Sequence, residues 1–212
     1  MLAQRWDLHR TDVRPGADAV LDVTDAAACR AAFTDADAVV HLGAVPDPDA
    51  SWEQLLPANV IGGHCVVQAA MDSEVRRLVL ASSLHAVGGY PGGRQVRATD
   101  APSPTNLYGA SKVWLEALGS WAAHSSETSV VALRIGYFGV EPPSGPDVTD
   151  PQWAAWLSAR DCGELIRAAV ETEGLTWAVV NGISANRHRF ADLSETQAVV
   201  GYRPVDDAWA GS

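Results

Sequence analysis

Tyr108 and Lys112 stand four residues apart, and their types and spacing could do chemistry. On a helix, side chains four residues apart lie on one face and reach the same small volume. A tyrosine hydroxyl, with an ordinary pKa of about 10, is a poor acid or base near neutrality, but a neighbouring ammonium favours its phenolate. A hydroxyl from Ser83 could hold a substrate oxygen while Tyr108 takes or gives the proton. The three residues predict acid/base chemistry at a hydroxyl or carbonyl carbon.

Strands that alternate with helices must position these residues. We expect strands at 6–13, 19–23, 38–42, 77–81, 129–135 and 177–181, and helices at 24–33 (with Thr24 as N-cap), 51–71, 106–124, 161–171 and 193–200. Loops are expected at 85–100 and 139–151. This alternation predicts an α/β fold with a doubly wound parallel sheet, Rossmann-like. Gly43 and Ser83 follow or end buried strands, and the carboxyl edge of such a sheet binds ligands.

Size and charge narrow the possible partners. The 212 residues suggest a single domain, with small substrate-side elements from about residue 136. A net charge of -11 and a pI near 4.8 argue against nucleic acid and anionic membranes as partners. The first ten residues do not resemble a signal peptide and no stretch is long enough to span a bilayer, so we expect a cytoplasmic protein. Cys29, Cys65 and Cys162 fit neither a disulfide framework nor a metal site.

Five runs of residues carry a resemblance to a known family. They are 40–44 (Val-His-Leu-Gly-Ala), 59–62 (Asn-Val-Ile-Gly), 81–83 (Ala-Ser-Ser), 108–112 (Tyr-Gly-Ala-Ser-Lys) and 133–135 (Leu-Arg-Ile). In order and spacing they resemble the extended short-chain dehydrogenase/reductases, the NAD-dependent epimerase/dehydratase family. Residues 81–91 and 134–142 look most like uronate dehydrogenases, which oxidise the anomeric carbon of a hexuronic acid with NAD.

The resemblance implies a role for particular residues. It makes Ser83, Tyr108 and Lys112 the catalytic set, and it implies NAD as the cofactor and a small-molecule substrate. The cofactor contacts would be Asp12 (ribose hydroxyls), Asp22 and Val23 (adenine), Leu42, Gly43, Ala44 and Asn59, with Ser82 and Lys112 near the nicotinamide; the substrate contacts would be Ser83, Leu84, His85 and Tyr137. The residues alone allow plainer roles, because Asp commonly forms turns or caps at strand ends and a helical Asn commonly bonds to nearby backbone. His41 and His85 are more often structural than basic in such positions.

Two departures from the family pattern stand out. The family's first strand, glycine-rich turn and most of its first helix should precede Asp12 by roughly thirty residues, the length of a βαβ unit, and this sequence lacks them. The chain therefore looks N-terminally truncated, and we expect weak or absent NAD binding because the usual pyrophosphate site is missing. A late start, a natural loss or a second chain that completes the sheet would each account for this. The missing strand would lie between those ending at Asp12 and Gly43.

The substrate pocket also departs from the uronate pattern. Leu84, Tyr137 and Pro46 replace polar residues, and the loop at 142–151 has no Arg or Lys to clamp a carboxylate. A less charged sugar or a polyketide-like alcohol is therefore as plausible as a uronate. The leading hypothesis is an oxidoreductase or epimerase/dehydratase-like enzyme. The alternatives are a cofactor-independent isomerase or lyase and a non-catalytic ligand-binding protein on the same fold. A homodimer through the helices that carry Asn59 and Tyr108 is expected only by analogy.

Overall fold

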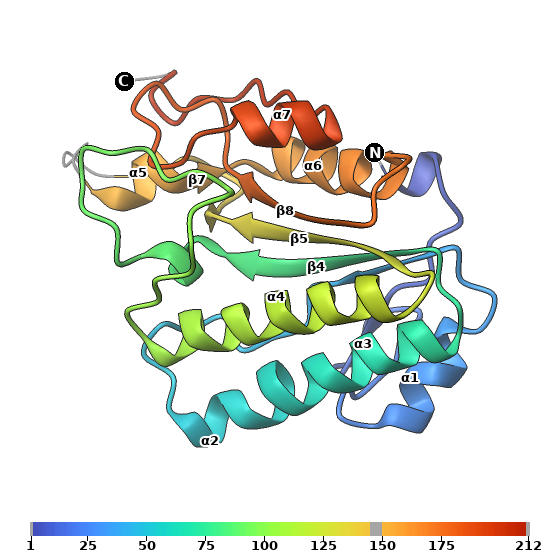
Figure 1. The fold of residues 1–212 in the computed structure, drawn as a ribbon. Helices are drawn as coiled ribbons and strands as arrows, with labels where there is room; N and C mark the ends of the chain where they lie inside the picture. Colours follow the sequence, from blue (N-terminus) through green and yellow to red (C-terminus); the bar gives the residue numbers. More distant parts are fainter. Residues whose placement is uncertain (1, 145–149, 211–212) are drawn as a thin grey trace.

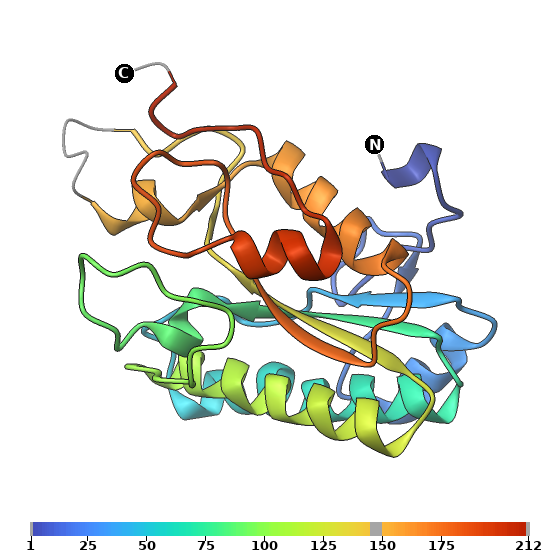
Figure 2. The same cartoon turned by 45° about the horizontal axis from the view of Figure 1, so that its top comes forward.

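The computed structural model describes residues 2–144 and 150–210, in which a parallel sheet lies between two layers of helices (Figures 1 and 2). The sheet has the order β3-β4-β5-β8, and its strands are β3 (Ala38–His41), β4 (Arg77–Ser83), β5 (Ser129–Ile135) and β8 (Trp177–Gly182). Helices α1 (Ala26–Phe33), α3 (Gly63–Asp72) and α4 (Leu107–Ser125) cover one face, and α6 (Ala159–Glu171) and α7 (Ser194–Val200) cover the other. The predicted doubly wound α/β fold is confirmed.

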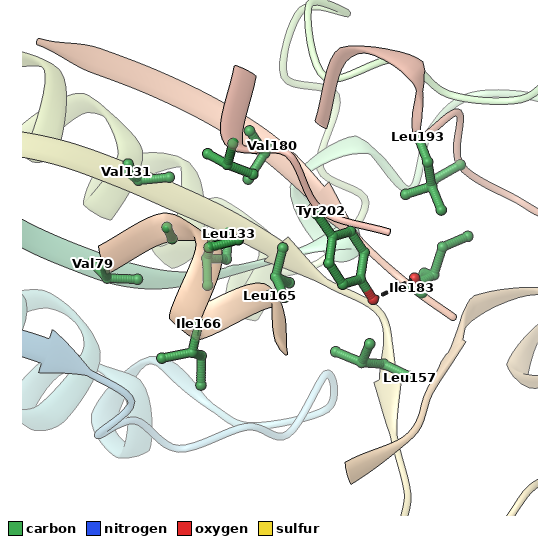
Figure 3. Close-up of a cluster of buried hydrophobic side chains, with 14 of the residues drawn as sticks. Val79, Val131, Leu133, Leu157, Leu165, Ile166, Val180, Ile183, Leu193 and Tyr202 are labelled. Carbon is green, nitrogen blue, oxygen red and sulfur yellow. Dashed lines mark hydrogen bonds between the residues drawn. The ribbon is translucent and has the colours of Figure 1, made fainter. Parts of the chain in front are cut away.

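Two hydrophobic clusters hold the sheet between these layers. β4 is buried at every position because both of its faces are covered. On the side of α6, Leu133, Leu165 and Tyr202 belong to one cluster, and the Tyr202 hydroxyl donates to the carbonyl of Ile183 at 3.0 Å (Figure 3). The second cluster includes Leu80 and lies under α1, α3 and α4. Packing on both sides fixes the carboxyl ends of β4 and β5, where the predicted site lies.

The helix expected at 51–71 is divided into three segments. α2 (Trp52–Leu55) passes into a wider π-helical segment, η2 (Leu56–Gly62), which continues into α3. Pro57 stands at the start of η2 and has no backbone N–H, so the regular α-helical ladder cannot continue through it. The π segment carries Asn59.

The strand expected at 6–13 is much shorter in the structure. Only β1 (Thr11–Asp12) forms, and it pairs with β2 (Ala19–Val20) in a separate two-stranded parallel sheet. Asp18 accepts bonds from the backbone and side chain of Arg10, which turns the chain between the two strands. A 3-10 turn, η1 (Leu2–Gln4), occupies the start of the described chain.

Caps and small elements also differ from the prediction. Thr24 is not the N-cap of α1, because the Asp25 carboxylate accepts the N–H groups of Ala27 and Ala28, both at 2.9 Å. A 3-10 turn, η3 (Leu84–Val87), follows β4. The loop expected at 139–151 borders three further elements: β6 (Tyr137–Phe138), α5 (Pro151–Ala155) and β7 (Trp156–Leu157), with β6 paired to β7.

Candidate active site

The structure brings Ser83, Tyr108 and Lys112 together at the carboxyl end of β4. Ser83 is the last residue of that strand, and Asn106 caps α4 so that Tyr108 lies in its first turn. The Lys112 ammonium lies 5.6 Å from the centre of the Tyr108 ring, and the Ser83 hydroxyl lies close enough to Tyr108 to lower its pKa. All three residues are buried. The arrangement can hold a substrate oxygen beside a phenol.

Burial dominates the proton affinities of this set. It raises the pKa of Tyr108, against a smaller lowering by the hydrogen bond with Ser83. Burial also lowers the pKa of Lys112 to about 8. Lys112 does not lower the pKa of Tyr108 as expected; its Nζ donates to the carbonyl of Ala81 at 2.8 Å. The pKa of His41 falls to about 4 through burial and the charge of Lys112, so His41 stays neutral.

A buried ionic network supports the set from behind. The Glu116 carboxylate accepts two bonds from the Arg134 guanidinium, both at 2.9 Å, and one from the Ser82 hydroxyl at 2.6 Å. The Arg134 Nη1 also donates to the carbonyls of Ala98 and Asp100 at 3.2 Å. Glu116 follows Lys112 by one helical turn, a signal that the sequence prediction did not use. Ser82 was predicted to contact the cofactor, but its hydroxyl donates to Glu116 in this network.

His85 lies edge-on against Tyr108, with ring centres 5.5 Å apart. Its Nδ1 faces the Asn106 Nδ2 at 3.1 Å, and the Asn106 Oδ1 accepts the Gly109 N–H at 2.7 Å. A Cβ on Gly109 would lie 2.4 Å from the His85 carbonyl oxygen, so only glycine permits this approach of η3 to α4. The structure thus joins His85 to the site through Asn106, whose part in the site the sequence prediction missed.

The other predicted substrate contacts, Leu84 and Tyr137, have different surroundings. The Leu84 side chain is 7% exposed and belongs to the hydrophobic cluster on the α6 side. Tyr137 is exposed on β6. In the loop at 142–151, where the carboxylate clamp was sought, residues 145–149 lie outside the described residues.

The predicted cofactor contacts after β3 gather at one edge. Leu42 is 55% exposed beside the exposed Gly43. A Cβ on Gly62 would lie 2.6 Å from the Val23 Cγ2, and one on Gly43 would lie 3.8 Å from the Val23 Cγ1. Exposed apolar surface next to a glycine at the carboxyl end of a parallel strand fits the middle of a dinucleotide.

Asn59 has a structural role in this arrangement. Its Oδ1 accepts the Val45 N–H at 2.8 Å, and its Nδ2 donates to the Val45 carbonyl at 3.2 Å and to the Ser111 hydroxyl at 3.1 Å. Asn59 therefore ties the segment that follows Ala44 to α4. The structure gives it the backbone-bonding role that its residue type alone allowed.

The predicted adenosine contacts lie at the ends of β1 and β2. Asp12, Arg10 and Arg14 line an open hollow of about 500 Å³. Two bonds from Arg14 lower the pKa of Asp12, which stays an exposed carboxylate suited to ribose hydroxyls. Asp22 accepts the Thr24 N–H and hydroxyl at 2.9 and 2.8 Å, a turn-forming role. The residues present fit the two ends of NAD, whereas the sequence has no Gly-x-Gly-x-x-Gly for its pyrophosphate.

Other features are separate from this set. A hollow of about 390 Å³ beside β7 is lined by Glu141, Ser158 and Arg160 among others, and Ser83, Tyr108 and Lys112 do not line it.

Across residues 2–144 and 150–210, no three His, Cys, Asp or Glu side chains gather as metal ligands. All three cysteines are free thiols. In the same part of the chain, no helix combines the length and the apolar character needed to cross a membrane.

Comparison with known proteins places these features in a family. Residues 2–146 match the model of the NAD dependent epimerase/dehydratase family. The chain is 36% identical to the NAD-dependent glucose-6-phosphate dehydrogenase of Haloferax volcanii, over 89% of this chain and 76% of that protein. It is also 36% identical to the L-arabinose 1-dehydrogenase (NAD(P)(+)) of the same organism, over 92% and 85%. The structure of uronate dehydrogenase from Agrobacterium tumefaciens superposes with a TM-score of 0.84 at 30% identity, over 94% and 75%, and a mutant of that enzyme was solved with NAD.

Proposed function

Because the chain belongs to the NAD-dependent epimerase/dehydratase family, we propose that it is an NAD-dependent dehydrogenase of a sugar-like substrate with Tyr108 as acid/base. The observation that carries this proposal is the buried contact of Ser83, Tyr108 and Lys112 at the end of β4. The relatives that are 36% identical are both named as sugar dehydrogenases, which supports the same reaction type.

The residues divide the work as follows. The Ser83 hydroxyl donates a hydrogen bond to the substrate oxygen, and the Tyr108 phenolate accepts the proton of the substrate hydroxyl. NAD, when bound, accepts the hydride from the carbon. Lys112 does not lower the pKa of Tyr108 in the structure, so its proposed part is to hold a positive charge 5.6 Å from the centre of the Tyr108 ring, which would attract the negative charge of the phenolate once it forms. Asp12 would hold the adenosine ribose, and Leu42 and Gly43 would line the middle of the cofactor.

Charge supports a neutral sugar as the substrate. The loop at 142–151 supplies no cation, and the net charge of -11 disfavours the approach of an anion. His85 and Tyr137 offer hydrogen-bonding groups instead, from η3 and β6. The elements from about residue 136 onward would form the substrate side of the site. An aldose is therefore favoured over a uronate or a sugar phosphate.

Replacement of the phenol tests the proposal. We expect Tyr108→Phe to lower the rate of NADH formation with a panel of aldoses by about 100-fold or more, since it removes the proton acceptor. Tyr90→Phe is the matched control, because the Tyr90 hydroxyl bonds only to the Ala101 carbonyl among the described residues. Equal turnover by Tyr108→Phe and the wild type, with both folded by circular dichroism, would contradict the role of Tyr108.

Cofactor binding is tested separately by calorimetry. We expect NAD to give a heat of binding and to protect the protein against unfolding. Asp12→Ala should weaken that binding by removing the contact with the ribose hydroxyls. If saturating NAD gives neither heat nor protection against unfolding, the dehydrogenase proposal is wrong.

A further inference from the structure

The bonds of Asn106 determine which nitrogen of His85 carries the proton. A backbone N–H can only donate, so the Asn106 atom 2.7 Å from the Gly109 nitrogen is its oxygen. The other atom of the same amide, 3.1 Å from the His85 Nδ1, is then the NH₂ group, which can also only donate. The His85 Nδ1 must accept this bond, so the ring proton lies on Nε2.

The surroundings of His85 keep the ring neutral. Burial alone lowers the pKa of His85, with no carboxylate close enough to oppose it. The titratable group that faces it is Tyr108 of α4, with Lys112 on the ring of Tyr108. η3 and the residues that follow it add no charge that changes the pKa of His85. Neither Tyr108 nor Lys112 contributes to the lowered pKa of His85, so burial alone favours the neutral imidazole.

None of the described residues forms a hydrogen bond with the His85 Nε2, and His85 is only half-buried, so a substrate can reach this nitrogen. The backbone of η3 is fixed nearby, since the Ser83 hydroxyl accepts the His85 N–H at 3.2 Å and Gly109 lies against the His85 carbonyl. A free N–H on a fixed ring, edge-on to the Tyr108 ring, is available to a substrate oxygen.

We propose that Asn106 is a positioning residue, which holds His85 as a neutral imidazole with its proton on Nε2 and so makes it a hydrogen-bond donor to the substrate beside Tyr108. Asn106 has two functions at once, since the amide oxygen caps α4 and the amide nitrogen orients His85. The part that concerns substrate rests on the proposed function, whereas the tautomer of His85 does not.

An aspartate at position 106 separates the two functions. In Asn106→Asp the carboxylate still caps α4, since Asp is as good an N-cap as Asn. Its second oxygen can only accept, so the His85 Nδ1 must become a donor and the imidazolium is favoured. Asn106→Ser is the matched control, because serine caps the helix but is too short to reach the ring.

The tautomer is read by ¹⁵N NMR of the histidine rings, with His85→Gln used to assign the signals. In the wild type we expect Nε2–H through the neutral pH range. In Asn106→Asp we expect the titration midpoint of His85 to rise by about one pH unit or more, while the melting temperature stays close to that of Asn106→Ser. A wild-type proton on Nδ1, or a midpoint that is the same in Asn106→Asp and the wild type, would overturn the proposal.

Kinetics test the link to the substrate. Below the new midpoint of Asn106→Asp, we expect KM for the sugar to change with pH while the wild-type KM does not, because only the variant changes the charge of His85. If the NMR result holds but the wild type oxidises no sugar, the proposed function fails and the positioning role stands. If sugar oxidation is normal in the wild type and KM in Asn106→Asp shows no added pH dependence, the contact of His85 with the substrate is wrong.

Discussion

Two buried arginines differ in their partners. Arg134 has a bidentate bond to Glu116, whereas Arg77 donates to the Thr172 carbonyl and its Nε and Nη1 have no partner in the described chain. Both side chains are about 2% exposed. An unpaired buried cation costs more free energy than a paired one, because nothing offsets its lost hydration.

Replacement of Glu116 and replacement of Arg77 should therefore change the free energy of unfolding by different amounts. Glu116→Gln leaves the Arg134 charge without a carboxylate, and we expect it to lower the free energy of unfolding by about 3 kcal/mol. Arg77→Met removes an uncompensated charge and should change that free energy by less than about 1 kcal/mol or raise it. Urea titrations followed by circular dichroism compare the two variants with the wild type. A loss as large in Arg77→Met as in Glu116→Gln would show that Arg77 has a strong partner.

The burial of Lys112 makes stability depend on pH in a definite direction. Its pKa is 10.5 when exposed and about 8 in the fold, so the unfolded chain holds a proton that the native state loses between these values. Stability conferred by this group therefore rises from about pH 8 to about pH 10.5. We expect the stability advantage of Lys112→Met over the wild type to shrink by up to about 3 kcal/mol across that window. Urea unfolding at matched pH measures it, and a constant difference would contradict the lowered pKa.

Part of the site could be predicted from residues alone. Tyr108 and Lys112 share a face because the helix period is a local property, and Ser83 follows from the apolar run that ends there. The bond between Glu116 and Arg134 could not be predicted, since it joins α4 to β5 and depends on their packing. The contact of Asn106 with His85 required knowledge of η3, a turn that no periodic pattern marks.

The elements were predictable where apolar runs or periods are long. β5 has the bounds expected from its sequence because it is paired on both sides along its length. β1 and β2 were expected to be longer, but each pairs only with the other, over two residues. The two-residue strands β6 and β7 carry no periodicity, so no sequence pattern could reveal them.

The outer face of α4 predicts self-association. Leu107, Trp114 and Trp121 are 51, 42 and 44% exposed. Each follows the one before it by seven residues, which is about two helical turns, so the three side chains form one apolar stripe along α4. We expect a homodimer in which this stripe is buried. Trp121→Arg should weaken the dimer at least about tenfold in sedimentation velocity. Val205→Arg is the control, since Val205 is exposed and its N–H bonds to Asp161 of α6 on the other face of the sheet, and an unchanged dimer in Trp121→Arg would exclude the stripe as the interface.

At the scale of the whole molecule, fold and specificity have separate origins. The alternation of strands and helices was enough to predict the sheet, and the TM-score of 0.84 to a uronate dehydrogenase agrees with it at only 30% identity. We expect specificity to depend on a few side chains that follow the sheet strands, among them Pro46, Leu84 of η3 and Tyr137 of β6. An architecture of this kind holds a hydride-transfer site steady while its loops change the sugar that it accepts.

The position of β3 has a consequence for motion inside the sheet. β4 and β5 are each paired on both sides, whereas β3 pairs with β4 alone among the described strands. Backbone amides paired on both sides open only in large cooperative unfolding, while those of an edge strand open by local fraying. Deuterium should therefore enter β3, and β8 at the opposite edge, before β4 and β5, so the strand that bears Ser83 belongs to the slowest-opening unit of the sheet.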